Sequence, residues 1–346
     1  MEHNTNELQA STDYFLAVLL KVFKTSVKNL RCYSLKGDAS GRNYFRLKFD
    51  SIENNISSVV LMQLRNPPIQ KNTPFVVTQA FLTECGINVP KLYFKDDDKG
   101  FIFLEDLGDI TLEEKLMISS IEEQEKYYER AIDILLNMQV ECTMRLNKDV
   151  PAYYLAFDLE KLTWELDFMA THFIEGFLKQ TISENDKQTL KEELLKVCST
   201  LSKQKRYFCH RDFHSRNIMI HKDNLILIDF QDARTGPCQY DIASLLRDSY
   251  FKLNPGLIEK LLNEYINKKE EREGSAIDRA EFLKVFDLMC IQRNLKALGT
   301  FGYQVSVKKN ERYRDAIPRA IEYIFSNLSK YNDLQRLKRC LEILYN

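Results

Sequence analysis

The sequence lacks the features that would place the protein in a membrane, outside the cell or on a polyanion. No apolar run is long enough to span a bilayer, and the first residues show no basic segment followed by an apolar one, as a signal peptide would. The formal net charge is only −1, so no global field favours nucleic acid or an anionic membrane. We therefore expect a soluble, cytoplasmic protein with neither nucleic-acid nor membrane partners.

Paired cysteines are also lacking. The chain has eight cysteines, and no two of them form a C-x-x-C pair. This scattered pattern is typical of reduced thiols in an intracellular protein, and it argues against a disulfide framework or a zinc site. Internal repeats, low-complexity tracts and proline-rich linkers are absent as well, so the 346 residues read as ordinary globular sequence, long enough for two lobes.

Strand-forming sequence dominates the first third of the chain. A helix is expected over residues 8–30 and a short one over residues 73–85. Between and after them, β-branched and aromatic residues in short runs predict strands in residues 31–49 and 56–65, and a hairpin turning at residues 96–100. This part of the chain is therefore predicted to form a small β-rich lobe.

Helical periodicity dominates the remainder, most clearly over residues 121–145, 155–178 and 184–204. Short strands interrupt it within residues 206–230, after which the helical pattern resumes. The sequence thus predicts an α+β fold in which a β-rich lobe, residues 1–106, precedes a helical lobe, residues 107–346. A functional site is expected in the cleft between the lobes.

The stretch "CHRDFHSRNIMI" (209–220) contains the pattern H-R-D-x-x-x-x-N. Phosphoryl transfer needs a carboxylate to accept the proton of an attacking hydroxyl, and Asp212 is the candidate base. Magnesium prefers hard oxygen ligands, which Asn217 and Asp229 would supply from the two strands of a hairpin. The alternative, a capped turn with a solvated Asp, is less favoured because Asp229 ends an apolar strand, "LILID".

A glycine-containing turn in "LKGDASGRNYFRL" (35–47) can place backbone N–H groups over nucleotide phosphates. An ordinary hairpin with two glycines is the alternative. The residues of this candidate phosphate loop are Gly37, Asp38, Ala39, Ser40, Gly41 and Arg42. In "FIFLEDLGD" (101–109), extended backbone at Glu105 is a candidate to hydrogen-bond an adenine edge between the lobes, although we assign its carboxylate no chemical role.

The segments "HRDFHSRN" and "IDFQDARTGPCQYDIASLLRD" resemble the aminoglycoside-phosphotransferase-like kinases. Together with "GDASGRNYFRL", "LEDLGD" and "IQRNLKALGTF", they most closely resemble the anomeric N-acetylmuramate/N-acetylglucosamine kinases of cell-wall recycling. The resemblance implies a protein-kinase-like two-lobe fold that binds ATP and Mg²⁺ in the interlobe cleft. It also implies phosphorylation of the anomeric hydroxyl of an amino sugar and a pathway link to a sugar-1-phosphate uridylyltransferase.

The same resemblance assigns roles to individual residues. Asp212 would be the catalytic base, and Asn217 and Asp229 the magnesium ligands. Arg211 would lie near the transferred phosphoryl group, and Asp232 would face the sugar. Asp241 would be the buried carboxylate that braces the catalytic loop.

Two departures from kinase patterns stand out. The magnesium motif ends in Gln231 rather than glycine and no A-P-E segment follows, so a protein substrate is not expected. The strand "VVLMQLR" also lacks the lysine that usually contacts nucleotide phosphates. Arg42, Lys48 or Arg65 are the alternatives for that charge.

Residues 251–346 contain 18 Lys and Arg against 13 Asp and Glu, an excess of five positive charges. This argues against a polycationic antibiotic as the acceptor. Arg293 is a candidate to bind the lactyl carboxylate of N-acetylmuramate, with a solvated or interlobe-paired arginine as the alternative. Trp164 could stack on a sugar face, with Glu165 binding hydroxyls, although a core position is more usual for a tryptophan. Another small alcohol, an aminoglycoside, or a non-catalytic nucleotide-binding role remain the alternative functions.

Overall fold

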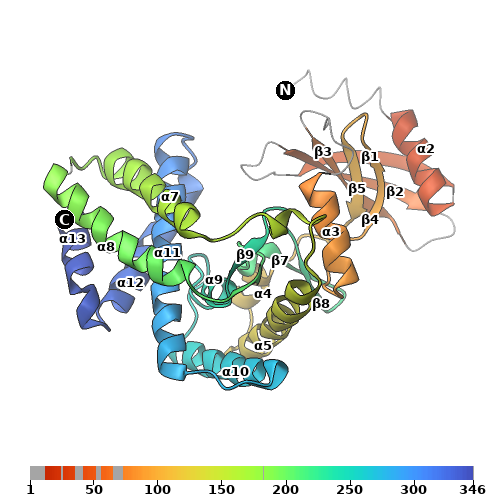
Figure 1. The fold of residues 1–346 in the computed structure, drawn as a ribbon. Coiled ribbons are helices and arrows are strands. Elements are labelled where there is room, and N and C mark those ends of the chain that lie inside the picture. The colour runs from red at the N-terminus through yellow and green to blue at the C-terminus, as the bar shows by residue number, and fades with distance from the viewer. Residues whose placement is uncertain are drawn as a thin grey trace.

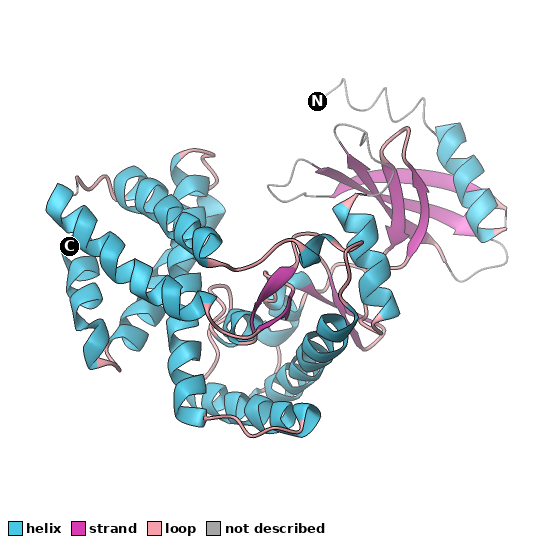
Figure 2. Ribbon diagram, viewed as in Figure 1, coloured by secondary structure: helices cyan, strands magenta, loops and turns pink. Residues whose placement is uncertain are grey.

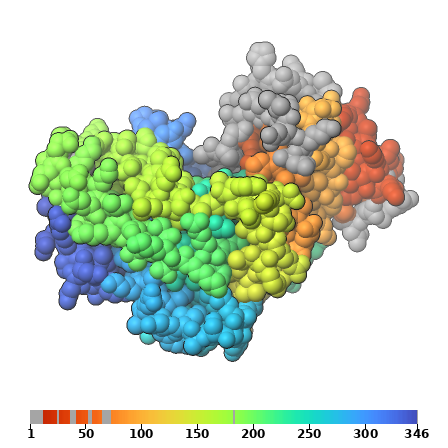
Figure 3. Space-filling view, in the orientation of Figure 1, coloured from red at the N-terminus to blue at the C-terminus, as the bar shows by residue number. Residues whose placement is uncertain are grey.

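The computed structural model describes residues 12–24, 26–35, 42–51, 56–64, 73–181 and 183–345. A sheet makes up most of the amino-terminal lobe, and helices make up most of the rest of the molecule (Figures 1 and 2). The surface view shows the β-rich lobe projecting from the larger helical part (Figure 3). This architecture confirms the predicted α+β class, while the division of the chain at residue 106 stays a prediction.

The amino-terminal sheet has the strand order β1-β2-β3-β5-β4, and each neighbouring pair is antiparallel. Its strands are β1 Val27–Leu35, β2 Arg42–Ser51, β3 Ser58–Leu64, β4 Leu92–Asp96 and β5 Phe101–Glu105. Side chains alternate across the sheet because a strand has a period of two. Leu47 and Leu61 therefore join a core under the outer helix α2 (Thr12–Phe23), whereas Met62 faces the other side and joins the main core.

The helix predicted over residues 8–30 is too long in its second half. Helix α2 ends at Phe23 and strand β1 begins at Val27, while residues 8–11 lie outside the described part of the chain. In the segment 27–30, Val27 and Leu30 lie three residues apart, a spacing that fits the helical period. Pairing with β2, in which Val27 lies opposite Ser51, decides the outcome in favour of a strand.

Helix α3 (Pro74–Glu84) lies between β3 and β4 in the chain and packs against both lobes. Thr73 caps its first turn by accepting a hydrogen bond from the N–H of Val76, and a proline follows directly, as is common at a helix start. The Phe81 ring packs 5.6 Å from Phe208 of the helical lobe. Residues of α3, of the inner sheet face and of the helical lobe belong to one continuous core.

The helical lobe contains one long helix, α11 (Arg279–Ser306), against which α7, α9 and α12 pack. Helices α5 and α10 also pack on each other (Figure 1). The remaining helices are α4 Leu112–Met117, α5 Ile121–Asn137, α6 Thr143–Arg145, α7 Leu159–Met169, α8 Glu184–Ser202, α9 Gln239–Leu246, α10 Pro255–Glu273, α12 Ile317–Leu328 and α13 Gln335–Tyr345. Two π-helical segments, η1 Met138–Cys142 and η3 Ala170–Phe177, continue α5 and α7. The predicted long helices are therefore confirmed in these places.

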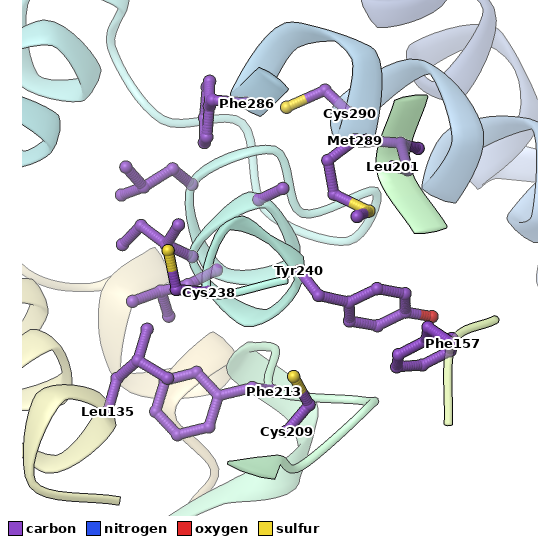
Figure 4. Packing of buried hydrophobic residues seen from close by; sticks show 14 of the residues in the cluster. Leu135, Phe157, Leu201, Cys209, Phe213, Cys238, Tyr240, Phe286, Met289 and Cys290 are labelled. Atoms are coloured by element: carbon purple, nitrogen blue, oxygen red, sulfur yellow. The ribbon is translucent and has the colours of Figure 1, made fainter. Parts of the chain in front are cut away.

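Two short antiparallel pairs lie at the centre of the molecule. Strands β6 (Arg206–Cys209) and β9 (Arg234–Pro237) form one pair, and β7 (Ile218–His221) and β8 (Asn224–Leu227) form the other. Helix α9, every residue of which is buried, packs beside them. Figure 4 shows Tyr240 of α9 against Phe157, whose rings stack at 3.8 Å.

In the described part of the chain, no helix combines the length and the apolar character needed to cross a bilayer.

Candidate active site

The loop between β6 and β7 is fixed by carboxylates that the buried helix α9 and its C-terminal end supply. Asp241 accepts hydrogen bonds from the backbone N–H groups of His210 and Arg211, at 2.6 and 3.0 Å. Asp248 accepts from both the N–H and the hydroxyl of Ser215. Arg211 also has a φ of 85°, in the left-handed region that side chains rarely adopt. Several hydrogen bonds therefore hold the loop backbone in one conformation, as a preorganised site requires.

Asp212 projects from this loop toward several positively charged side chains. Its Oδ1 lies 3.0 Å from the Nζ of Lys296 on α11, and its Oδ2 lies 3.8 Å from the Nε of Arg211. Burial by itself would raise the pKa of Asp212, but these two cations, together with His214 and Arg293, more than offset it. The pKa of Asp212 is therefore held well below its ordinary value, and the carboxylate is ionised at neutral pH.

Asn217 and Asp229 lie next to each other across the β7–β8 hairpin. The backbone N–H of Ile228 donates to the carbonyl of Asn217 at 3.0 Å, so the two segments meet directly before Asp229. The side-chain Nδ2 of Asn217 donates to the carbonyl of Asp212 at 2.9 Å, which orients its amide. Gln231 donates to Oδ1 of Asp229 at 2.7 Å. The hairpin predicted to bring Asn217 and Asp229 to one edge is therefore present.

Strand β8 is shorter than predicted, because it ends at Leu227 rather than at Asp229. Asp229 has a φ of 64°, which is incompatible with a continuing strand. The next residue, Phe230, is fully buried and stacks on Phe75 of α3 at 5.0 Å. This ring contact couples the position of Asp229 to helix α3.

Two cavities of similar size adjoin this hairpin. One, of about 390 Å³, lies between the sheet and the segment after β5, and the other, of about 400 Å³, lies within the helical lobe. Asn217, Asp229 and Gln231 line both cavities, so the two proposed metal ligands stand where the cavities meet. Among the described residues, no cluster of three or more His, Cys, Asp and Glu side chains is placed to hold a metal by itself.

The first cavity, which we call the hinge cavity, has largely apolar walls. Val60, Leu104 and Ile228 contribute to them, and Glu105 lies at the end of β5, where its N–H donates to the carbonyl of Lys91. Arg46 also lines this cavity, but its guanidinium is held by Asp106 and by the more exposed Asp109, both at 2.8 Å. The pairing largely neutralises its charge.

The phosphate-loop prediction falls mostly on Gly37 to Gly41, which lie outside the described residues. Arg42, the last residue of that prediction, begins β2, and its guanidinium lies 6.0 Å from the Phe75 ring. On β3, Met62 shares the cavity-facing side with Val60 and is fully buried. A buried methionine therefore stands two residues after Val60, on the face from which a strand lysine would point into the cavity.

The second cavity, which we call the acceptor cavity, carries most of the charge. Arg211 pairs with Asp232 at 3.0 Å on its wall. Arg293, predicted as a carboxylate ligand, lines the same cavity, but its guanidinium lies over the Tyr240 ring at 4.6 Å and donates to the carbonyl of Arg211 at 3.4 Å. Arg293 is thus attached to the catalytic loop rather than solvated.

Trp164 and Glu165 do not line either cavity. Trp164 is 55% exposed on α7, with the ammonium of Lys161 at 3.9 Å from its ring, so the alternative of a core tryptophan is wrong. Glu165 is buried and accepts a hydrogen bond from Gln292 at 3.0 Å. Its contacts hold α7 on α11, and the candidate role in binding sugar hydroxyls stays a prediction without cavity contact to support it.

Lys296 was missed at the sequence level although the signal was present. It lies three residues after Arg293 in "IQRNLKALGTF", a spacing that places both side chains on one face of a helix. The structure brings both to the acceptor cavity. Only the spatial packing of α11 on the loop shows that Lys296 contacts Asp212, in addition to the neighbouring Arg211.

Comparisons with known proteins agree with this geometry. Residues 33–277 match the phosphotransferase enzyme family, APH. The N-acetylmuramate/N-acetylglucosamine kinase of Pseudomonas aeruginosa is 30% identical over 313 residues, which cover 89% of this chain and 86% of that protein. The protein of the same name from Neisseria meningitidis is 29% identical, over 87% and 86% of the two chains.

Solved structures share the fold at low sequence identity. A choline kinase from Cryptosporidium parvum superposes with a TM-score of 0.63 at 11% identity, over 97% of this chain and all of that one. An ADP-bound aminoglycoside phosphotransferase superposes with a TM-score of 0.56 at 16% identity, over 88% and 95% of the two chains. The two-lobe, kinase-like fold predicted from the sequence is confirmed.

Proposed function

Because the chain belongs to the phosphotransferase enzyme family, we propose that it transfers the γ-phosphoryl group of ATP to the anomeric hydroxyl of N-acetylmuramate or N-acetylglucosamine. The observation that carries this proposal is the meeting of the two cavities at Asn217 and Asp229, beside the ionised Asp212. A donor in one cavity and an acceptor in the other would present their reacting groups at that point.

The hinge cavity suits the nucleotide. Apolar side chains such as Val60 and Leu104 can enclose a flat base, and the extended backbone after Glu105 can hydrogen-bond its edge. The phosphates would then extend toward Asn217 and Asp229. The predicted phosphate loop, Gly37 to Arg42, would contribute backbone N–H groups to these phosphates.

Asn217 and Asp229 fit Mg²⁺ because both offer hard oxygen donors. The Nδ2 of Asn217 is occupied by the carbonyl of Asp212, so the opposite end of the amide, its Oδ1, is the end available to a metal. Magnesium bound there would neutralise charge on the nucleotide phosphates. Because it usually takes several ligands from phosphate and water, two protein ligands are sufficient.

Asp212 is placed to act as the general base. As the acceptor hydroxyl oxygen forms its bond to the γ-phosphorus, the bond from that phosphorus to the β,γ-bridging oxygen breaks, and the hydroxyl proton passes to Asp212. Lys296 and Arg211 keep the carboxylate ionised and hold its orientation. Arg211 also lies close enough to the junction to balance negative charge on the transferred group.

The choice of acceptor rests on the named relatives and on charge. Both relatives are named as kinases of the same two amino sugars, and the acceptor cavity contains more cationic than acidic side chains. A polycationic aminoglycoside would be repelled by such a lining. The product would be a sugar 1-phosphate, the type of compound that a uridylyltransferase consumes, made in the cytoplasm where ATP is available.

A panel of acceptors, assayed by ADP release, tests the proposal. We expect turnover with N-acetylmuramate or N-acetylglucosamine and little with choline, homoserine or an aminoglycoside. Turnover with one of these other alcohols and none with either amino sugar would refute the assignment of the acceptor. It would leave the phosphotransferase activity itself intact.

A non-catalytic nucleotide-binding protein is the second candidate, since Met62 occupies the face of β3 from which a lysine would reach the phosphates. The three residues Asp212, Asn217 and Asp229 argue against it, because binding alone does not require a base next to two metal ligands. Thermal unfolding with ATP, with and without Mg²⁺, separates the two. Stabilisation by ATP that is independent of the metal, without ADP release, would favour the non-catalytic role.

A further inference from the structure

The acceptor cavity is lined by more positive charge than the proposed reaction uses. Its cationic side chains are Arg211, Arg216, Arg247, Arg293, Lys296 and Arg312, and its acidic ones are Asp212, Asp229, Asp232 and Asp248. The excess of two positive charges lies within one cavity of about 400 Å³. The question is which of the cations are already compensated by the protein.

Four of the six cations have partners. Arg211 pairs with Asp232, Lys296 with Asp212, and Arg293 donates to the carbonyl of Arg211. Arg216 makes a two-bond contact with Glu113, at 2.6 and 3.0 Å. These four side chains hold the catalytic loop and its surroundings; three of them pair with carboxylates, whereas the partner of Arg293 is a neutral carbonyl.

Arg247 and Arg312 are different. Arg247 follows the last turn of α9, and its buried Nε has no hydrogen-bond partner in the described part of the chain. Its guanidinium lies 5.3 Å from the Tyr323 ring, a contact that positions the group without neutralising it. Arg312 lies in the short helix η5 (Glu311–Ala316), is exposed, and forms no ion pair with any acidic side chain among the residues described.

None of the acids of the cavity pairs with Arg247 or Arg312 among the described residues, and each contacts another group; Gln231 donates to Asp229. Asp212 and Asp232 bind Lys296 and Arg211. The two oxygens of Asp248 accept from Ser215 and from the N–H of Tyr250. Arg247 and Arg312 therefore have no carboxylate partner among the described residues, and a ligand can supply one.

From these contacts we propose that Arg247 and Arg312 form a subsite for a carboxylate carried by the acceptor sugar. The inference rests on the proposed function, in which one of the two amino sugars has a lactyl carboxylate and the other does not. Guanidinium groups bind carboxylates through paired N–H donors, which makes arginine well suited to this discrimination. This subsite replaces Arg293 as the expected determinant of preference for N-acetylmuramate.

Aromatic rings in the same wall give the sugar itself a place to lie. Phe301 contacts Tyr250 at 6.2 Å and Tyr313 at 5.7 Å, and all three line the acceptor cavity. Tyr313 is adjacent in sequence to Arg312, and Tyr250 lies three residues after Arg247. A sugar ring packed on this aromatic wall would therefore carry its substituents close to both arginines.

The test uses Arg312→Gln, because an exposed residue can be changed without disturbing the core. The measured quantity is the ratio of kcat/KM for N-acetylmuramate to kcat/KM for N-acetylglucosamine. We expect the substitution to lower this ratio about 10- to 100-fold, the effect of losing one hydrogen bond to a charged group. Arg312→Lys, which keeps the charge without the paired donors, should lower it less.

Arg314→Gln is the matched control. Arg314 lies in the same short helix but pairs with Glu311 at 2.6 Å and does not line the cavity, so its substitution should leave the ratio unchanged. An unchanged ratio in Arg312→Gln, or an equal fall in Arg314→Gln, would overturn the subsite. A wild-type protein inactive on both sugars would instead refute the proposed function on which the subsite rests.

Discussion

The two cavities are nearly equal in volume but opposite in character. The hinge cavity is enclosed largely by aliphatic side chains such as Val60 and Leu104, and its one cation among the described residues, the half-buried Arg46, is outnumbered by four carboxylates. The acceptor cavity is enclosed by charged side chains and retains an excess of positive charge. The hinge cavity can therefore select a ligand by its shape and by hydrogen bonds to the protein main chain, whereas the acceptor cavity can select a ligand by its charge.

On the proposed function, this difference suits one cavity to the nucleotide and the other to the acceptor alcohol. A nucleotide base is neutral and flat, and an apolar slot with main-chain donors is sufficient to bind it. The acceptor differs among relatives of the fold, which include a choline kinase and an aminoglycoside phosphotransferase. On the present proposal, the charges in the acceptor cavity decide which alcohol is used, and substitutions in the two cavities should affect different kinetic constants.

The largest expected effect is that of Asp212→Asn, which should lower kcat about 100- to 10,000-fold because it removes the general base. Nucleotide binding in the hinge cavity should persist, as measured by thermal stabilisation with ATP and Mg²⁺. Asp223→Asn, in the exposed β7–β8 turn where the left-handed backbone tolerates Asn, is the control. If Asp212→Asn keeps most of its kcat, Asp212 is not the base.

Lys296→Met should change the pH dependence rather than the binding of ATP. Lys296 lowers the pKa of Asp212, so its loss raises that pKa, and the part of the acid limb of kcat/KM that reflects Asp212 should move toward higher pH. Arg at this position should restore much of the wild-type profile. A variant that loses activity equally at every pH would show a structural role instead.

Val60→Phe tests the proposed nucleotide site in the hinge cavity, whereas the two preceding variants test the catalytic loop. The larger ring narrows the apolar slot, and we expect KM for ATP to rise about tenfold, the scale of a steric misfit in a packed site. KM for the sugar should remain nearly unchanged, and Val60→Ile should give a smaller effect in the same direction. A parallel rise in both KM values would contradict the functional separation of the cavities.

The smallest effect concerns His210, which belongs to the loop beside both cavities. Burial lowers the pKa of His210 from 6.5 to about 4. Between these two pH values His210 is protonated in the unfolded chain but neutral in the folded chain. Its contribution to the free energy of unfolding is therefore fully present above pH 6.5 and is lost as the pH drops toward 4. Between pH 6.5 and about 5.5, the loss should be about 1 kcal/mol.

His210→Gln should remove this part of the pH dependence. The measurement is the free energy of unfolding by denaturant at the two pH values, for the wild type and for the variant. Equal losses in both would mean that His210 does not contribute, and that other groups account for the sensitivity to acid.

The sequence was sufficient to predict site residues that lie close together in the chain, because a single loop and hairpin set their relative positions. The catalytic loop and the β7–β8 hairpin were both recognisable, because Asp212, Asn217 and Asp229 lie within 18 residues of one another. The helices of the second lobe were recognisable from their periodicity. The roles assigned to these residues stay predictions until the variants are measured.

Features that depend on distant packing were not predictable. Strand β9 reads Arg-Thr-Gly-Pro, which has almost no strand propensity and exists only because it pairs with β6. Lys296 and Arg312 reach the cavity from positions 84 and 100 residues after Asp212. A core position was favoured for Trp164, yet neighbouring Glu165 is the buried one; the helical spacing of Leu162, Leu166 and Met169 places position 165 rather than 164 on the buried face.

The continuous core that runs through α3 has a consequence for folding. Met62 of the sheet, Phe81 of α3 and Phe208 of the helical lobe belong to the same buried cluster, so neither lobe can lose its packing without exposing apolar surface on the other. The two lobes are architectural units rather than independent folding units, and they should unfold in one cooperative step. The separate cluster beneath α2 lies on the opposite face of β2, β3 and β5, the same strands that line the hinge cavity, so its loss would disturb that cavity as well.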